Sequence, residues 1–335
     1  MNRRTFNVAS LAALLSPMPR LSLASITAQT APGHQVAEIK NGQFTASHGG
    51  MATSRTAVND NTLFQVASCS KTVTALAVLT LVRDGRVELD QPASTYLRRW
   101  RLQGPRGETA TVADLLSHTA GTTVHGFAGY GPDEELPSTL EILSGHPPAN
   151  SDPIRTRQRL FRRFSYSGGG TMVLQSLIED VTGIGFASYA GAEVLEPVGA
   201  DHATFAITPN AGFAHGTHED GKPLPGGFRR HPESAAAGLW ATASDLARVM
   251  DAIVQSLRGT PDAIIPKALA RRMVTPVSGQ SALGVFVHSD STIFHDGRNF
   301  GFDATMAAEL DTGRIRAAVT NRNGALEGLL HTLPD

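Results

Sequence analysis

The stretch from Thr72 to Val82 places the strongest constraint on how this chain can fold. It carries no charged residue, so a helix over these residues belongs inside the protein. A serine and a lysine, Ser68 and Lys71, stand three residues apart at the start of this helix. Because residues i and i+3 of a helix share one face, we expect the Lys71 amine to reach the Ser68 hydroxyl.

This placement of Ser68 and Lys71 has chemical consequences. Burial disfavours the charged form of a lysine and lowers its pKa, which suits an amine that must take a proton from a nucleophile. Ser68 lies where backbone N–H groups lack helical partners, which favours a developing oxyanion. The alternative is an N-cap serine followed by a surface lysine. The chain has only four lysines, so one at the head of its most apolar helix favours catalysis.

Composition excludes several classes of protein. The 335 residues are 41% apolar and 18% charged, as in an ordinary globular protein with one large core or two unequal lobes. A formal net charge of −1 gives no electrostatic reason to expect nucleic acid as a partner. The single cysteine, Cys69, excludes an intramolecular disulfide and a zinc site built from several cysteines. We expect no metal and no cofactor.

Strand patterns at both ends of the chain enclose a helical middle. An Asn41-Gly42 pair within residues 36–46 predicts a hairpin. Helices are predicted at 68–82, from Thr111, at 170–182 and at 244–254, with long loops at 119–163 and 204–234. After Pro276 come short alternating strands at 283–288, 292–295, 304–310 and 315–320. This order predicts an α+β fold, in which N- and C-terminal strands form one antiparallel sheet flanked by helices and the helical block forms a second lobe.

The first residues have the pattern of an export signal. Arg3 and Arg4 precede an apolar run at residues 8–15, which resembles a twin-arginine signal, and cleavage after Ala24 would follow a small-x-small sequence. We expect residues 1–24 to be removed and the mature chain to be periplasmic or secreted. The alternative is a short basic start of a cytoplasmic protein. No later stretch is apolar enough to cross a membrane, so we expect no membrane span in the mature chain.

The sequence around the serine and lysine resembles a known family. The words Phe64-Gln-Val-Ala-Ser-Cys-Ser-Lys-Thr72 and Leu81-Val-Arg-Asp-Gly-Arg-Val-Glu-Leu-Asp90 are similar to the active-site segment of the serine β-lactamase-like family. Its members are class C β-lactamases, D-alanyl-D-alanine carboxypeptidases, D-aminopeptidases and esterases. The resemblance implies one catalytic domain over residues 25–335. Its α/β lobe would comprise about 33–67 and 270–330 and its helical lobe about 85–265, with the active site between them.

The resemblance also assigns roles to a tyrosine segment. Tyr166 matches the tyrosine of the family's Tyr-x-Asn motif, which carries protons during catalysis. A phenol ionises near pH 10, so Tyr166 can act as a base only if a cation such as Lys71 stabilises its phenolate. Gly168 stands where the family has an asparagine that binds the acylamino group of the substrate. This departure weakens the case for efficient β-lactam hydrolysis.

A third segment, His295-Asp296-Gly297, fits the family's His-x-Gly strand beside the site. His295 would bind a substrate carboxylate or carbonyl, or tune Tyr166. Gly297 would let the backbone approach the substrate, and the amide of Arg298 would hold the oxyanion together with that of Ser68. A histidine here, where class C lactamases have lysine, favours the peptidase and esterase branch.

These observations predict an exported serine hydrolase that forms an acyl-enzyme on Ser68. Its substrates would be D-amino-acid peptides, related amides or small esters. The alternatives are a class C-like β-lactamase, and a penicillin-binding or sensing protein that is acylated but deacylates slowly. His118, in a segment that also resembles the family, is expected to be structural.

Overall fold

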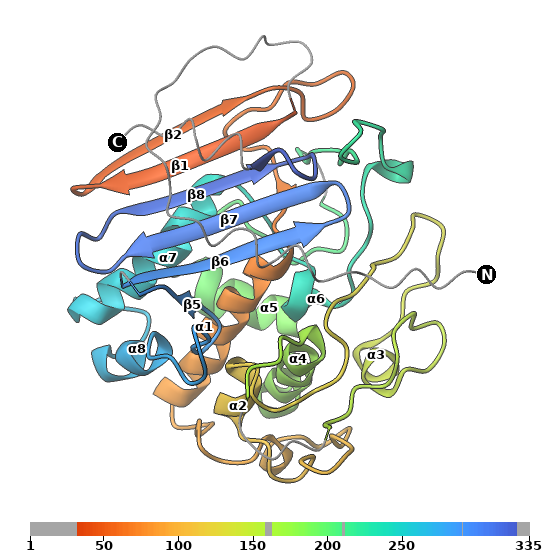
Figure 1. Cartoon of the computed structure of the whole chain (residues 1–335), viewed down its shortest axis with the longest axis vertical. Coiled ribbons are helices and arrows are strands. Elements are labelled where there is room, and N and C mark those ends of the chain that lie inside the picture. The colour runs from red at the N-terminus through yellow and green to blue at the C-terminus, as the bar shows by residue number, and fades with distance from the viewer. Residues whose placement is uncertain (1–31, 158–162, 210–211, 290, 327–335) are drawn as a thin grey trace.

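The computed structural model describes residues 32–157, 163–209, 212–289 and 291–326. Within them, one six-stranded antiparallel sheet has the strand order β2-β1-β8-β7-β6-β5 (Figure 1). Its strands are β1 (His34–Lys40), β2 (Gln43–Gly49), β5 (Phe286–Val287), β6 (Thr292–Asn299), β7 (Phe302–Glu309) and β8 (Ile315–Thr320). The N-terminal hairpin and the C-terminal strands therefore complete one sheet, which confirms the predicted fold class.

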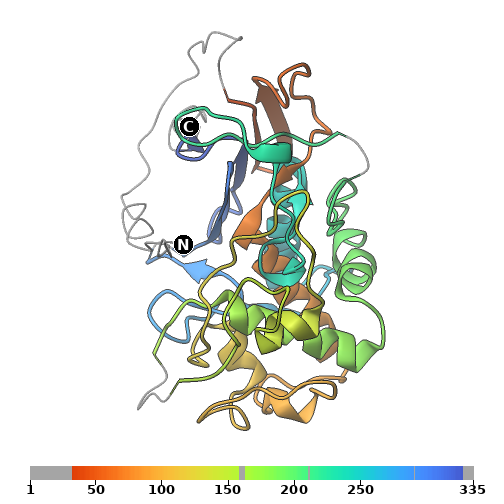
Figure 2. The same cartoon turned by 90° about the vertical axis from the view of Figure 1, so that its right-hand side faces the viewer.

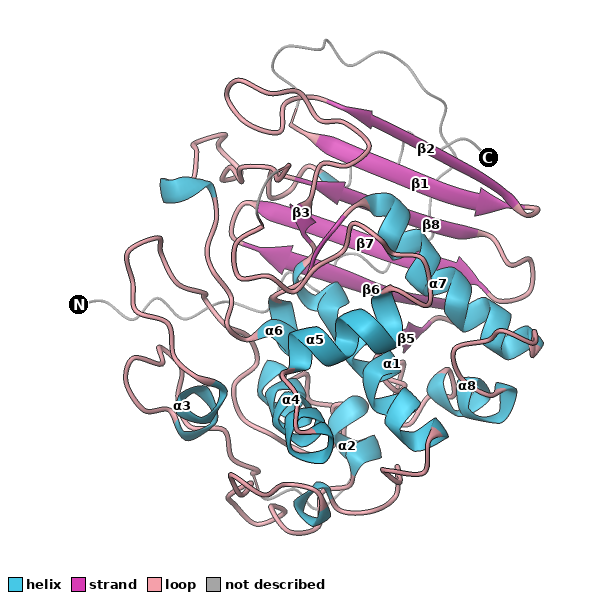
Figure 3. Cartoon of the chain, turned by 180° about the vertical axis from the view of Figure 1, so that it is seen from behind, coloured by secondary structure: helices cyan, strands magenta, loops and turns pink. Residues whose placement is uncertain are grey.

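The eight α-helices that the described residues form as named elements come from the middle of the chain. They are α1 (Ser70–Arg83), α2 (Val112–Leu116), α3 (Thr139–Ser144), α4 (Gly168–Thr182), α5 (Phe186–Ala190), α6 (Ser234–Ala237), α7 (Ala243–Arg258) and α8 (Lys267–Met273). Seen from behind, α7 runs across one face of the sheet, while α1 to α6 gather below it (Figure 3). The edge-on view shows the same separation between the strands and the helical part (Figure 2).

The predicted hairpin turn has the geometry its residues require. Asn41 and Gly42 both have positive φ, at 53° and 76°, as a two-residue hairpin turn of the primed type demands. The β6–β7 hairpin turns between Asn299 and Phe302 in the same two-residue manner. This second hairpin carries His295, Gly297 and Arg298 on one continuous strand.

The uncharged helix is buried as the sequence predicts. Every residue of α1 from Ser70 to Leu81 is buried. Its N-terminal end is joined to the rest of the structure by two short paired strands, β3 (Phe64–Gln65) and β4 (Trp240–Ala241). This pairing brings the residues before α1 next to those that connect α6 with α7.

Capping residues explain where several helices begin. Thr111 caps α2 with a capping box to Asp114, as predicted. The helix expected from Ser244 begins at Ala243, because Thr242 and Asp245 form its capping box. The region expected to be loops contains α3, whose capping box pairs Ser138 with Glu141. In the described residues no helix is both long and apolar enough to span a bilayer.

Candidate active site

Ser68 lies in a short 3-10 turn, Ala67–Cys69, between β3 and α1. The residue before it, Ala67, has a left-handed φ of 48°, which costs a non-glycine residue about 1 kcal/mol. Ser70 holds this turn in place. Its hydroxyl donates to the Ala67 carbonyl over 2.5 Å and accepts from the Leu239 amide over 3.0 Å. Ser68 is partly exposed between buried neighbours, so the turn brings this residue to the surface.

Lys71 reaches the Ser68 hydroxyl, as the helical spacing predicts. Its amine lies 3.0 Å from Ser68 Oγ and donates to the Ala236 carbonyl of α6 over 2.6 Å. The side chain is buried, and these hydrogen bonds pair it with a hydroxyl and a carbonyl rather than with a carboxylate. Burial therefore lowers the pKa of Lys71 from 10.5 to about 7. A substantial neutral fraction can then accept a proton near neutral pH.

Tyr166 contacts the same oxygen from the segment that precedes α4. Its hydroxyl donates to Ser68 Oγ over 2.7 Å. Burial raises the pKa of the Tyr166 phenol, and its hydrogen bond to Ser68 only partly opposes this. The phenol thus stays protonated, which differs from the expectation that Lys71 holds it as a phenolate. The desolvation of the phenolate is the largest cause, and the negative potential of Asp296 acts in the same direction.

The ring of His118 packs against the ring of Tyr166. The two rings lie with centroids 4.5 Å apart. The Ser167 amide donates to His118 Nδ1 over 3.2 Å, and the Ser165 amide donates to the His118 carbonyl over 2.8 Å. Burial lowers the pKa of His118 well below 6.5, so its ring is neutral and accepts at Nδ1. These contacts position the Tyr166 segment, in keeping with the structural role expected for His118.

His295 lies buried in the middle of β6. Its Nδ1 is 2.8 Å from the Asp296 carbonyl oxygen, an atom that only accepts, so Nδ1 carries the proton and Nε2 the lone pair. Burial, with a smaller contribution from Lys71, lowers the pKa of His295 to about 3. His295 is therefore a neutral acceptor at Nε2. It lacks the charge needed to bind a substrate carboxylate, which was one of the roles considered for it.

Gly297 allows a close approach of two backbone segments. A Cβ at this position would lie 2.1 Å from the Val66 carbonyl oxygen and 3.1 Å from the Ser68 nitrogen. The sequence suggested that Gly297 gives the substrate access to the backbone. In the structure the close neighbour is the turn that carries Ser68, so Gly297 fixes the distance between β6 and that turn.

The amide of Arg298 points away from β7. The Leu310 amide donates to the Ser291 carbonyl, which fixes the alternation of hydrogen bonds along the β6–β7 pair. By this alternation the Arg298 amide faces the side of β6 where β5 has already ended. The Arg298 guanidinium extends elsewhere, to Asp303 over 2.8 and 3.1 Å.

Gly168 begins α4 and faces an aromatic ring. A Cβ here would lie 3.0 Å from Phe127 Cε2 and 3.2 Å from the His125 carbonyl oxygen. Its φ is not positive, so glycine is needed here to leave room for the neighbouring atoms and not to allow an unusual backbone conformation. The ring of Phe127 thus crowds the position from which the family's asparagine side chain would start.

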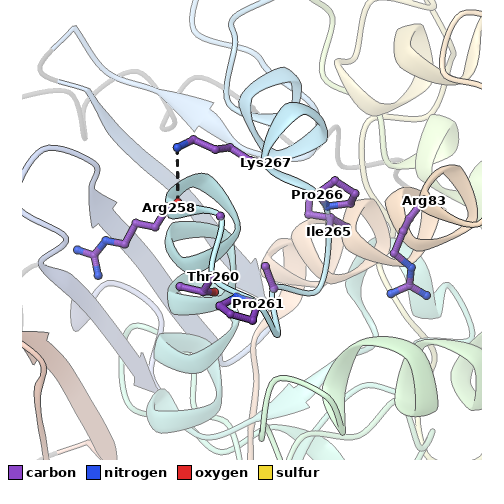
Figure 4. Close-up of a pocket in the computed structure, with 9 residues that line it drawn as sticks. Arg83, Arg258, Thr260, Pro261, Ile265, Pro266 and Lys267 are labelled. Atoms are coloured by element: carbon purple, nitrogen blue, oxygen red, sulfur yellow. Dashed lines mark hydrogen bonds between the residues drawn. The ribbon is translucent and has the colours of Figure 1, made fainter.

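A separate cavity of about 520 Å³ lies at the far end of α1. It is bordered by Arg83, Arg258, Thr260 and Lys267, among others (Figure 4). The guanidinium groups of Arg83 and Arg258 point away from each other in this view, so they do not converge on one anion. Ser68 and Lys71 lie at the other end of α1.

Two features of the site had little or no sequence signal. The Ala236 carbonyl that holds Lys71 belongs to a backbone whose position depends on the β3–β4 pair. Phe127 and Phe286 contact site residues from segments with no motif. Across the described ranges no group of three or more His, Cys, Asp or Glu side chains is placed to hold a metal ion.

Comparison with known proteins places this geometry in context. A sequence model described as beta-lactamase matches residues 18–332. A beta-lactamase of Pseudomonas fluorescens is 29% identical, over 65% of this chain and 58% of that protein. The esterase EstB of Burkholderia gladioli is 28% identical, over 64% and 61% respectively. The chain spans roughly two to three fifths of the length of the first curated relatives that it matches.

A solved structure gives the same fold. The octameric penicillin-binding protein homologue from Pyrococcus abyssi superimposes with a TM-score of 0.71 at 24% identity, over 90% of this chain and 74% of that one. The likeness supports the sheet order and the helical arrangement described above. With a family match over most of its length, the chain belongs to the beta-lactamase family.

Proposed function

We propose that this chain is a serine hydrolase that cleaves small uncharged esters through an acyl-enzyme on Ser68. One observation carries the proposal. Ser68 Oγ lies 3.0 Å from an amine whose pKa is lowered and 2.7 Å from a phenol whose pKa is raised. A base and an acid of these strengths on one hydroxyl are suited to moving its proton in both directions.

The steps follow from these contacts. Neutral Lys71 takes the Ser68 proton as Oγ bonds to the substrate carbonyl carbon, and the amides of Ser68 and Arg298 hold the oxyanion. Tyr166 gives its proton to the leaving oxygen as the carbon–oxygen bond breaks, and the proton on Lys71 restores the phenol. Water then attacks the acyl-enzyme by the reverse route and releases the acid. One ester and one water give one acid and one alcohol.

Two features support esters over D-amino-acid peptides. Gly168, crowded by Phe127, offers no side-chain amide for an acylamino group. His295 is a neutral acceptor and cannot pair with a terminal carboxylate. One relative over most of its length is named an esterase, which agrees with this choice.

A β-lactamase is the second candidate, because a relative of equal similarity carries that name. A slowly deacylating penicillin-binding protein is the related possibility. These functions are separable by intact-mass spectrometry after incubation with penicillin. A lasting adduct on Ser68 indicates a binder, and rapid loss of β-lactam without an adduct indicates a lactamase. An esterase leaves both the protein mass and the penicillin unchanged.

The direct test is a substrate panel of p-nitrophenyl acetate, a D-alanyl dipeptide and nitrocefin, each with wild type and Ser68→Ala. We expect turnover of the acetate that disappears in the variant. Hydrolysis of the dipeptide or nitrocefin with a higher kcat/KM than the acetate would overturn the ester assignment.

We also propose that the chain is exported by the twin-arginine route. The support is the sequence of residues 1–24, which lie outside the described residues. Replacing Arg3 and Arg4 by lysine should leave the precursor in the cytoplasm. Unchanged appearance of mature protein in the periplasm would contradict this route.

A further inference from the structure

An aromatic cluster adjoins the proposed acid of the site. We define the Phe286 cluster as Phe164, Tyr166, Phe286 and His295. The Phe286 ring centroid lies 6.4 Å from that of Tyr166, 5.8 Å from that of Phe164 and 5.3 Å from that of His295. Phe286 therefore lies near both the Tyr166 segment and β6.

The cluster reaches the surface at Phe164, although its His295 ring is buried. Phe164 is 42% exposed, one of the few large apolar side chains in the described chain with such exposure. Phe286 is half-buried and lies edge-to-face with Phe164, at an interplanar angle of 84°. The Phe164 amide donates to Ser278 Oγ over 3.1 Å, which holds the ring at this surface. Aromatic surface left open beside a reactive hydroxyl is suited to a second aromatic or apolar group.

The position of Tyr166 decides which part of a substrate this surface meets. Tyr166 donates to Ser68 Oγ, and in the proposed reaction it passes its proton to the oxygen that departs. The Phe286 ring stacks on the Tyr166 ring at an interplanar angle of 24°, and Phe164 packs against Phe286 in turn. An alcohol that receives its proton from Tyr166 therefore departs beside this aromatic cluster.

The charge of the cluster restricts that alcohol further. His295 has its proton on Nδ1 and contributes only a lone pair at Nε2. Lys71 is the cation that acts on His295, and its amine is already bonded to Ser68 and Ala236. Asp296 adds a negative potential at Tyr166. Among these groups a leaving-group carboxylate meets no cation that is not already hydrogen-bonded, so burying it there would cost more than burying an uncharged ring.

We infer that the Phe286 cluster is the leaving-group subsite and that it takes an uncharged aryl or bulky apolar alcohol. This inference rests on the proposed ester hydrolysis and names the half of the substrate that the enzyme selects. The selection lies in acylation, because every acetate ester leaves the same acetyl group on Ser68.

The test compares acetate esters that differ only in the alcohol. We expect Phe164→Ala and Phe286→Leu to lower kcat/KM for 2-naphthyl acetate about fivefold, the size of a lost ring–ring contact, with less than twofold change for ethyl acetate. Phe44→Ala is the matched control, since Phe44 is 43% exposed on β2 and lies outside the cluster. Wild type should also prefer methyl 4-acetoxybenzoate to 4-acetoxybenzoate, which carries a carboxylate on its leaving group.

A binding measurement separates this inference from the hydrolysis itself. The Ser68→Ala protein cannot form the acyl-enzyme, so its affinity for 2-naphthol, followed by naphthol fluorescence, reports the subsite alone. Weaker binding after adding Phe164→Ala supports the subsite even if no ester is hydrolysed. The inference would be overturned by equal naphthol binding with and without Phe164→Ala. It would also be overturned if neither variant changed the ratio of kcat/KM for naphthyl acetate to that for ethyl acetate, or if wild type cleaved 4-acetoxybenzoate faster than its methyl ester.

Discussion

The two ends of α1 each carry a cation, and the two cations behave in opposite ways. At the N-terminal end Lys71 is buried against a hydroxyl and a carbonyl, and its pKa falls to about 7. At the C-terminal end Arg83 is partly exposed and donates to both oxygens of Asp84, over 2.7 and 3.1 Å. Pairing with Asp84 raises the pKa of Arg83.

This difference shows what makes a side chain reactive. A buried amine without a carboxylate stays poised between its two protonation states, whereas a paired guanidinium stays charged and contributes structure. The 14 residues of α1 place these ends about 20 Å apart. The cavity of about 520 Å³ adjoins the charged Arg83 end, whereas the poised amine lies at the other end of the helix.

The largest effect should come from the Ser68 hydroxyl, compared with a hydroxyl near the Arg83 end. Ser68→Ala should lower kcat/KM for p-nitrophenyl acetate about a thousandfold or more, because it removes the nucleophile. Thr260→Ala, which borders the cavity at the far end, should change it less than twofold. Circular dichroism would establish that both variants are folded. Equal losses in the two variants would break the comparison.

The two cations themselves give the next effect. Lys71→Met should lower kcat/KM at least a hundredfold, the usual contribution of a positioned base, while Arg83→Gln leaves it within twofold. Arg83→Gln should cost no more than about 1 kcal/mol of unfolding free energy, since the side chains of Arg83 and Asp84 are 33% and 41% exposed. Steady-state kinetics and urea denaturation measure the two quantities. An active Lys71→Met protein would remove Lys71 from the mechanism.

Lys71→Met should also stabilise the fold. Between pH 7 and 10.5 the unfolded chain keeps the lysine proton that the folded chain has released, so wild-type stability rises with pH over this range. Below pH 7 the full cost of burying the amine remains. The methionine variant lacks this cost, so its advantage in unfolding free energy should be largest near pH 6 and smallest near pH 10. A constant difference across this range would mean that Lys71 titrates normally.

The pH profile of the reaction gives a smaller but sharper test. Below the Lys71 pKa of about 7, kcat/KM should fall about tenfold per pH unit, as the neutral amine is lost. Above it, kcat/KM should stay level to pH 9, because the raised pKa keeps Tyr166 protonated. Arg83→Gln should keep the same profile. A rate that continues to rise through pH 9 would instead identify Tyr166 as the base.

The local sequence predicted the contact between Ser68 and Lys71, whereas the rest of the candidate site depends on tertiary contacts. The Ser68–Lys71 spacing and the absence of charge to Val82 were enough to predict a buried amine on a hydroxyl. Nothing local could show that Ala236 would supply the carbonyl for that amine, because the contact joins residues 165 positions apart. The same holds for the direction of the Tyr166 pKa, which depends on how completely the fold encloses the phenol.

Glycine positions show the same limit. The resemblance placed Gly297 beside the substrate, but its required closeness is to Val66, a packing relation between β6 and the Ser68 turn. The Asn41-Gly42 turn was predictable because its cause lies within two residues. Motifs thus indicate which residues matter, whereas the reason each is needed depends on neighbours distant in sequence.

The smallest predicted effect concerns Gly168, which stands where the family has an asparagine. An asparagine there would collide with Phe127, whose Cε2 lies 3.0 Å from the position of its Cβ. We therefore expect Gly168→Asn alone to lower the hydrolysis of p-nitrophenyl acetate and of nitrocefin together, a few-fold each. Adding Phe127→Ala gives the amide room to reach an acylamino carbonyl.

In the double variant the nitrocefin rate should rise about fivefold relative to the acetate rate, because one hydrogen bond is worth roughly 1 kcal/mol and the acetate has no group to receive it. Phe127→Ala by itself controls for the added space and should not change the ratio. If the single Gly168→Asn variant already shows the fivefold gain in relative nitrocefin rate, the Phe127 ring moves aside readily. The ring is then not what distinguishes this site from that of a lactamase. If the double variant shows no gain, the missing amide is not the cause either, and substrate choice at this end of α1 lies with the leaving-group side of the site.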